Sequence, residues 1–195
     1  MRSRQVAERA EATRATLIAV ARRLFVAHGY FATGTEEIVK EAGVTRGALY
    51  HHFADKKGLF LAVFRAVEDD LLANAGRMDA PDSFARLRGG LLGFLDASLT
   101  PEVQRVLLID GPAVLGWQEW RELEASYGLG SIRALLAAAI DEGTLRVQPI
   151  DALAHILLAS VDEAALYIAN AVDPVAARDL AVSAMDALLS GLARS

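Results

Sequence analysis

The sequence of 195 residues contains no cysteine and only five prolines. The absence of cysteine excludes disulfides, thiolate catalysis, cysteine-ligated zinc and iron–sulfur clusters, and it fits a reducing compartment. The chain also lacks a glycine-rich phosphate loop and an uncharged apolar run of about 18 residues, the length of a membrane span. Its charged start, with Arg2, Arg4, Glu8 and Arg9, offers no apolar signal core, so we expect a cytoplasmic protein.

Charge is unevenly distributed along the chain. Hydrophobic residues make up 53% of the sequence and charged residues 23%, a balance that excludes general disorder, and the net charge is −5. Residues 1–60 contain ten Lys or Arg against six acidic residues, a sum of +4, so the remainder carries −9. A basic first third suggests contact with a polyanion such as nucleic acid, although a mixed solvated surface gives the same sum by chance.

Apolar residues recur with helical spacing, and no run of alternating β-branched residues predicts a sheet. We therefore expect an all-α fold with about nine helices, divided by capping residues, glycines and prolines. Two short helices separated by a turn at Gly43 predict a helix-turn-helix. The other expected helices cover residues 11–28, 56–74, 82–98, 101–110, 116–142 with an irregularity at 128–130, 150–172 and 175–192.

One continuous segment carries a specific motif. The segment is Ala42-Gly43-Val44-Thr45-Arg46-Gly47-Ala48-Leu49-Tyr50-His51-His52-Phe53, with Lys56 three residues further on. Together with the residues before it, this segment resembles the DNA-binding domain of the TetR family of transcriptional regulators over roughly residues 12–60. The resemblance implies a three-helix DNA-binding domain over residues 1–55 and a helical bundle for effector binding and dimerisation over residues 56–195.

The resemblance also assigns roles to individual side chains. Arg46, whose fork suits guanine, and His51 are expected to explore base edges. Gly47 and Ala48 would let the helix approach the groove wall closely, or they serve helix packing alone. The residues expected to contact phosphate are Thr33, Thr45, Tyr50, His52 and Lys56.

The chain departs from the family pattern at one position. Gly34 stands where the family usually has a second hydroxyl residue after Thr33. The cap of the following helix and one phosphate contact therefore pass to Thr35 or are missing.

The sequence offers little for metal binding or catalysis. His51 and His52 are adjacent, and adjacent helical side chains point about 100° apart, so they do not converge on one ion. With four histidines, no cysteine and no phosphate loop, hydrolase or kinase chemistry lacks its usual parts. We expect no metal, no cofactor and no enzymatic activity.

The last two expected helices carry apolar stripes rich in small residues. Such stripes suit close packing against a second copy, and a monomer core has the same appearance. A helix-turn-helix reads symmetric half-sites best in pairs, and the resemblance places the dimer bundle on these helices, so a homodimer is expected. The expected interface residues are Leu157, Val161, Ala164, Ile168, Ala181, Ala184 and Leu188.

A small-molecule site needs apolar walls and a few converging polar groups. Asp110 is either an inward carboxylate or the end of a helix before Gly111-Pro112. Glu163 and Tyr167 belong to a polar stripe that is either pocket or solvated surface. The aromatic candidates, each of which could instead be core, are Phe64, Phe94, Trp117, Trp120 and Tyr127.

These features together predict a homodimeric, ligand-responsive repressor. It would bind a palindromic operator of double-stranded DNA and be released by a small-molecule effector. The alternative is a constitutive, ligand-free DNA-binding or scaffold protein whose body is a solid core, which a cavity of a few hundred cubic ångströms would disfavour.

Overall fold

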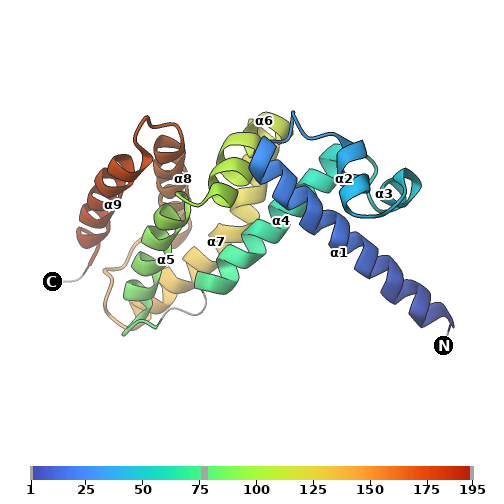
Figure 1. Cartoon of the computed structure of the whole chain (residues 1–195). Coiled ribbons are helices and arrows are strands. Elements are labelled where there is room, and N and C mark those ends of the chain that lie inside the picture. The colour runs from blue at the N-terminus through green and yellow to red at the C-terminus, as the bar shows by residue number, and fades with distance from the viewer. Residues whose placement is uncertain (1, 76–78, 194–195) are drawn as a thin grey trace.

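The computed structural model describes residues 2–75 and 79–193. Within these residues the chain forms nine α-helices and one π-helical segment, with 81% of the chain helical and no strand. Leu145 and Ala193 make an isolated antiparallel bridge. The predicted all-α fold is confirmed. The three N-terminal helices lie at one end of the molecule and the last two helices at the other (Figure 1).

The N-terminal helices are α1 (Arg2–His28), α2 (Thr35–Glu41) and α3 (Arg46–His52), so α1 begins earlier than predicted. Phe25, Ile38 and Leu49, one from each helix, are fully buried together. Gly43, between α2 and α3, has a φ of 66°, a left-handed conformation that glycine adopts without strain. The helix-turn-helix predicted from this glycine is therefore present.

Helix α4 (Lys56–Ala75) joins this unit to the rest of the chain. Asp55 starts the helix, since its Oδ1 accepts a hydrogen bond from the Gly58 amide at 2.7 Å. Phe60, in the first turns, packs its ring 5.6 Å from that of Phe25 in α1. The helix then runs on into the body without interruption (Figure 1).

The body consists of six further elements packed around an apolar core. Helix α5 packs on α7, α8 and α9, and α7 packs on α8. These elements are α5 (Ser83–Ala97), the π-helical segment η1 (Val103–Asp110), α6 (Gly111–Leu115), α7 (Trp117–Asp141), α8 (Ile150–Ala169) and α9 (Pro174–Ser190).

Two predicted details of the body are wrong. The helix expected over 101–110 is π-helical from Val103 and runs directly into α6. The irregularity expected at 128–130 is absent, because α7 is continuous there. Gly128 instead allows a close approach, since a Cβ at this position would lie 2.8 Å from Leu158 Cδ1 of α8.

Helix α8 is long and apolar enough to span a membrane by length and composition, with a mean hydropathy of 1.5 over its most apolar window. One face of α8, including Ala154, Leu158 and Ala165, is buried in the bundle. The opposite face exposes Ile156 and Tyr167 beside the charged Glu163. Part of the high hydropathy of α8 therefore comes from residues that pack within the protomer, and part from exposed apolar residues.

Candidate DNA-binding surface and ligand cavity

The exposed face of α3 carries hydrogen-bond donors. Arg46 extends from its first turn with its side chain 64% exposed, and its guanidinium lies 5.6 Å from the centre of the Tyr50 ring. Glu36 of α2 approaches Arg46, with Oε1 3.7 Å from Nη1. His51 is also exposed, whereas His52 is half-buried. This face can present a guanidinium, a phenol and imidazoles to one ligand surface.

The first turn of α3 is built to lie close to that surface. Thr45 caps the helix, because its Oγ1 accepts a hydrogen bond from the Ala48 amide at 3.2 Å. The hydroxyl of Thr45 remains free to donate to a phosphate. Gly47 is exposed and has only Thr45 near the position of a Cβ, so Gly47 serves no helix packing within the protomer.

The predicted phosphate contact from Thr33 is wrong. Thr33 is 1% exposed, and its hydroxyl lies 2.8 Å from the Gly29 carbonyl, to which it donates. Its role is to hold the turn between α1 and α2. Of the two alternatives for the α2 cap, the structure shows the missing cap, since Gly34 is the N-cap residue and no side chain caps the helix. Thr35 lies in the first turn and is half-buried.

Lys56 is oriented by an aromatic ring. Its ammonium lies 4.1 Å from the centre of the Tyr30 ring, a cation–π contact. Burial lowers the pKa of Lys56, and the charge of Asp110 opposes that effect. The side chain is half-buried beside the turn that precedes α2, at the start of α4. Lys56 therefore lies at the junction between the N-terminal helices and the body. A phosphate contact by Lys56 would be made from this junction.

Asp110 belongs to this same junction and does not line a cavity. It is 4% exposed, its Oδ2 accepts a hydrogen bond from the Tyr30 amide at 2.7 Å, and Arg105 Nε lies 3.4 Å from the same oxygen. Asp110 is thus the inward carboxylate of one alternative and not the end of a helix, because η1 runs directly into α6. It connects the body to the turn between α1 and α2.

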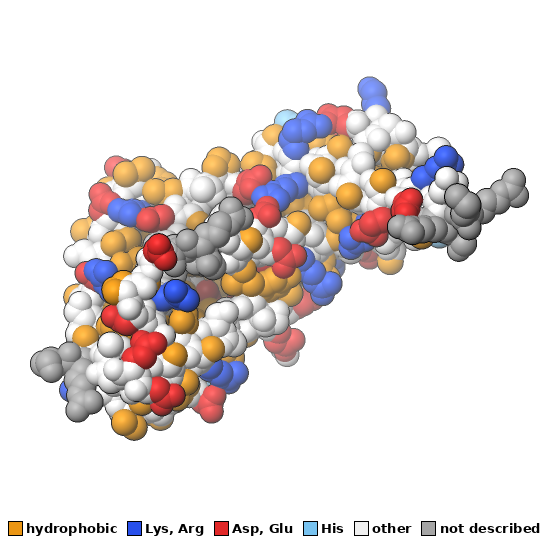
Figure 2. Space-filling view, turned by 90° about the horizontal axis from the view of Figure 1, so that it is seen from below, with side chains coloured by type: hydrophobic (Ala, Val, Ile, Leu, Met, Phe, Trp, Pro, Cys, Tyr) orange, Lys and Arg blue, Asp and Glu red, His pale blue; other side chains and the backbone are white. Residues whose placement is uncertain are grey.

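Charged side chains of both signs are scattered over the surface, and neither sign gathers into one field on the face shown in Figure 2. Several charged pairs join the N-terminal unit to the body. Arg22 of α1 contacts Asp70 of α4 at 2.6 Å and Glu102 before η1 at 2.5 Å. Lys57, in the first turn of the linking helix α4, contacts Glu119 of α7 at 2.7 Å. These pairs and Asp110 fix how the helix-turn-helix sits on the body.

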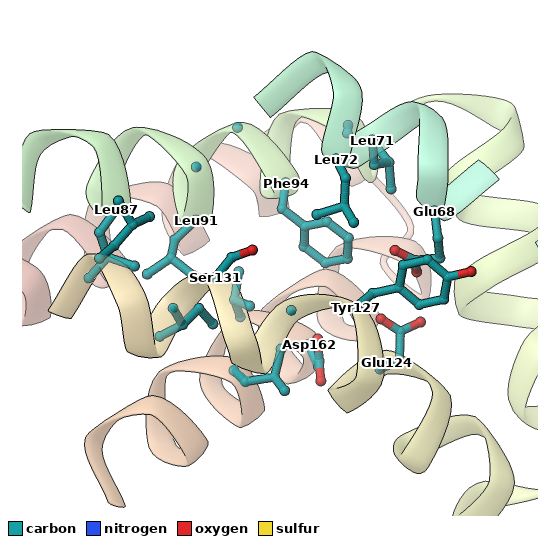
Figure 3. Close-up of a pocket in the computed structure, with 18 of the residues that line it drawn as sticks. Glu68, Leu71, Leu72, Leu87, Leu91, Phe94, Glu124, Tyr127, Ser131 and Asp162 are labelled. Carbon is teal, nitrogen blue, oxygen red and sulfur yellow. The ribbon is translucent and has the colours of Figure 1, made fainter. Parts of the chain in front are cut away.

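A cavity of about 660 Å³ lies in the body between α4, α5, α7 and α8. Its walls are mostly apolar, and Phe94 and Tyr127 line it, as predicted. Figure 3 shows both aromatic rings beside the carboxyl groups of Glu68 and Glu124. The size falls within the range of about 300–1,000 Å³ typical of small-molecule sites.

Three buried carboxyl groups line one part of this cavity: Glu68 of α4, Glu124 of α7 and Asp162 of α8. Burial raises the pKa of Glu68 to about 7 and that of Asp162 to about 6. Burial, followed by the charge of Glu68, raises the pKa of Glu124 well above its ordinary value. Arg121 pairs with Asp162 at 2.6 Å and partly opposes the rise there.

Sequence reasoning missed all three carboxyl groups, although a signal was present. Glu68 lies four residues after Phe64, and Glu124 lies four residues after Trp120, so each continues an apolar stripe along its helix. Asp162 similarly follows Leu158 by four residues. A carboxylate on a core-facing stripe predicts a buried acid, a sign of a functional site.

The other predicted pocket residues lie elsewhere. Phe64 and Trp120 are fully buried core, and Trp120 Nε1 donates to the Leu107 carbonyl at 3.0 Å. Trp117 is 58% exposed and lines only a shallow depression. Glu163 and Tyr167 lie on the outer face of α8. These placements correct the predicted pocket, because the rotation of a helix about its axis is set by packing that the sequence shows only in part.

The predicted dimer residues divide into two groups. Leu157, Val161 and Ile168 are buried within the protomer, and Ala181 is 9% exposed, so these side chains offer little surface to a partner. They face the bundle, as the monomer-core alternative held. The residues left accessible to a partner are Ala164, which is half-buried, and the exposed Ala184 and Leu188.

Comparison with known proteins matches both parts of the chain. Residues 17–63 match the family model described as bacterial regulatory proteins, tetR family, and residues 84–192 match a tetracyclin repressor-like C-terminal domain. A crystal structure of a TetR-family transcriptional regulator from Pectobacterium atrosepticum is 34% identical, with a TM-score of 0.86 over 96% of this chain and 97% of that chain.

Two curated relatives are similar over most of their length. The transposon Tn10 TetC protein of Escherichia coli is 28% identical over 77% of each chain. The HTH-type transcriptional repressor AcnR of Corynebacterium efficiens is 31% identical over 76% of this chain and 77% of its own. The two family models, which match residues 17–63 and 84–192, and these relatives therefore all indicate the same family.

Proposed function

The chain belongs to the TetR family of transcriptional regulators, and we propose that it binds a palindromic operator as a homodimer and releases it when a small molecule occupies the cavity. It is a DNA-binding regulator and not an enzyme. We further propose that it acts as a repressor in the cytoplasm. Occupation of the cavity would then switch on the regulated genes.

The observation that carries this proposal is the course of α4. Its first residue, Lys56, lies against the turn before α2, and its later residues Glu68, Leu71 and Leu72 line the cavity. A ligand that pushes on this part of α4 acts on the same rigid helix whose start contacts the DNA-binding unit. The cavity also argues against the alternative of a solid, ligand-free body.

A modest movement would be enough to release DNA. Two half-sites on one face of B-DNA lie about 34–36 Å apart, so two reading helices must keep that spacing to dock together. A ligand that favours a different spacing by about 1–3 kcal/mol would change operator affinity by roughly 5- to 150-fold. We divide the chain into a DNA-binding domain of residues 1–55 and an effector domain of residues 56–195 on this basis, with α4 as the link.

The outer surface of α8 and α9 supports the dimer. Leu180 and Leu188 of α9 are 65% and 63% exposed, and Ala184 lies between them on the same face. Ile156 on α8 is 60% exposed. Large exposed apolar side chains at helical spacing on two neighbouring helices are typical of a helix-bundle interface between copies.

The experiment that tests DNA recognition compares two arginine variants. Arg46→Ala is expected to lower affinity for the operator by about ten-fold and to affect a scrambled duplex much less, because a base contact contributes about 1–3 kcal/mol of discrimination. Fluorescence anisotropy with an operator selected from random duplex DNA measures both affinities. The control is Arg133→Ala on α7, which removes the same charge from the body.

Two results would contradict this assignment. One is an equal loss of affinity by Arg46→Ala for every duplex, which would make Arg46 a phosphate contact. The other is wild-type protein that selects no sequence, which would exclude specific operator binding. Steep weakening with added salt is expected in all variants, since phosphate contacts remain.

A further inference from the structure

We propose that the cavity binds an organic cation, whose charged centre lies between Glu68 and Glu124 and whose apolar body lies along α5 and α7. This inference rests on the proposed function in that the cavity is taken as the effector site. It adds the charge and the chemical class of the ligand. The contacts of the two carboxyl groups, the lining of the cavity and the other charges around it support it.

The two carboxyl groups are buried and incompletely satisfied. Glu68 is 5% exposed and Glu124 is 4% exposed. Among the described residues, the Oε1 atom of each has no hydrogen-bond partner. The two side chains also hydrogen-bond to each other, which lowers the pKa of Glu68 and raises that of Glu124, so this pair holds a shared proton that a cation would displace. A buried polar atom without a partner costs free energy, and a buried carboxylate without a cation costs more. Both carboxyl groups point toward each other at the same end of the cavity (Figure 3), so a single cation could contact both.

Basic side chains of the protein do not provide that cation. Arg121 of α7 pairs with Asp162 of α8 at 2.6 Å, and its charge lowers the pKa of Glu124 only partly against the effect of burial. Arg86 of α5 also lines the cavity, but it is exposed to solvent. On α4 itself, the negative charge of Asp69 further raises the pKa of Glu68. Burial raises the pKa of Tyr127, and the charge of Arg65 partly opposes that rise. When Glu68 and Glu124 are ionised, the balance of charge at this end of the cavity is therefore negative.

The rest of the lining indicates an organic ion and not a metal. Phe94 and Tyr127 stand beside the carboxyl groups, and aromatic faces attract organic cations. The described residues contain no group of three or more side chains suited to hold a metal ion. The apolar walls suited to the body of such a ligand include Leu71, Leu72, Leu87, Leu91, Ile132 and Leu135.

Proton release is a second signature of a bound cation. Burial raises the pKa of Glu68 to about 7 and that of Glu124 well above its ordinary value, so part of the pair is protonated near neutral pH. A cation favours the ionised carboxylates and displaces these protons. Cation affinity is therefore expected to increase as the pH rises through about 7 and to fall on acidification.

The test is calorimetric titration of the full-length protein, without DNA, with ions of matched shape and opposite charge. Tetraphenylphosphonium and the slimmer dodecyltrimethylammonium are expected to bind, and tetraphenylborate and dodecanoate are not. Glu124→Gln and Glu68→Gln should each weaken cation binding about ten-fold, which is the effect expected from losing one buried charge contact. Glu122→Gln, at an exposed position of α7 that does not line the cavity, is the matched control and should bind as the wild type does.

Each outcome bears on the proposal. Binding of neither cation, equal binding of cations and anions, or unchanged affinity in both variants would overturn it. Because these titrations contain no DNA, cation binding can hold even if operator release fails, which would contradict only the proposed function. Release of the operator by an anionic or neutral molecule, with no cation binding, would keep the proposed function and overturn the cation.

Discussion

Leu180→Arg is expected to convert a dimer into a monomer and to weaken operator binding by about 100-fold or more. This is the factor by which the affinity of two linked binding units exceeds that of a single unit. Leu180 is 65% exposed on α9, so the substitution leaves the protomer core untouched. At a symmetric interface the new charge would meet its own copy and lose its water, which a close-packed helix bundle does not accommodate. Light scattering and anisotropy with the selected operator measure the two effects.

Two control variants separate interface effects from unfolding. Val147→Arg adds the same charge at an 85% exposed position in the loop before α8 and should remain dimeric. Leu157→Arg places the charge in the protomer core, where Leu157 is 5% exposed, and should unfold the chain. A folded, monomeric Leu180→Arg protein that still binds the full operator as tightly as the wild type would exclude the dimer from recognition.

The second large effect concerns pH and the buried acids. Because the pKa of Glu68 in the folded protein is about 7, above its ordinary value of 4.5, the folded state holds a proton that the unfolded state releases between these values. The stabilising contribution is complete below about pH 4.5 and is lost as the pH rises through about 7. From about pH 5.5 to about pH 8, this group alone should lower the free energy of unfolding by about 2 kcal/mol.

Glu68→Gln tests this directly, since the amide cannot ionise. Between about pH 5.5 and about pH 8, urea denaturation of the variant should show a loss about 2 kcal/mol smaller than that of the wild type. The variant should also be the more stable protein at the higher pH. Glu122→Gln removes an exposed carboxylate from α7 and should follow the wild type. Parallel pH profiles of Glu68→Gln and wild type would show that Glu68 is not protonated in the folded protein.

The DNA-binding unit was predictable from sequence because its determinants are local. Gly43 provides the turn, Thr45 caps the reading helix, and Ile38 and Leu49 supply its core within a short stretch of chain. Thr33 was misassigned because a hydroxyl before a helix suits either a phosphate or a backbone carbonyl. Its burial against Gly29 decides between these, and burial depends on how the turn folds back on α1.

The effector region was less predictable because it depends on how four helices are rotated against one another. Glu163 was chosen from a polar stripe, while Asp162, one residue earlier and on the buried face, lines the cavity. Likewise, the stripe containing Leu157 and Val161 was correctly identified as apolar, but its partner is the protomer's own bundle. An apolar stripe in the sequence does not distinguish residues that pack within the protomer from residues that pack against a second copy of the chain.

If the cavity and the DNA-binding surface are coupled through α4, the ligand and the operator must change each other's affinity by the same factor. The measurement is the affinity of tetraphenylphosphonium for the protein alone and for the protein saturated with its selected operator. If ligand and operator favour different arrangements, saturating operator must weaken cation binding by roughly 5- to 150-fold, the same factor by which the cation weakens operator binding. Equal cation affinity with and without operator would show that the cavity is occupied without any effect on DNA and would contradict the account.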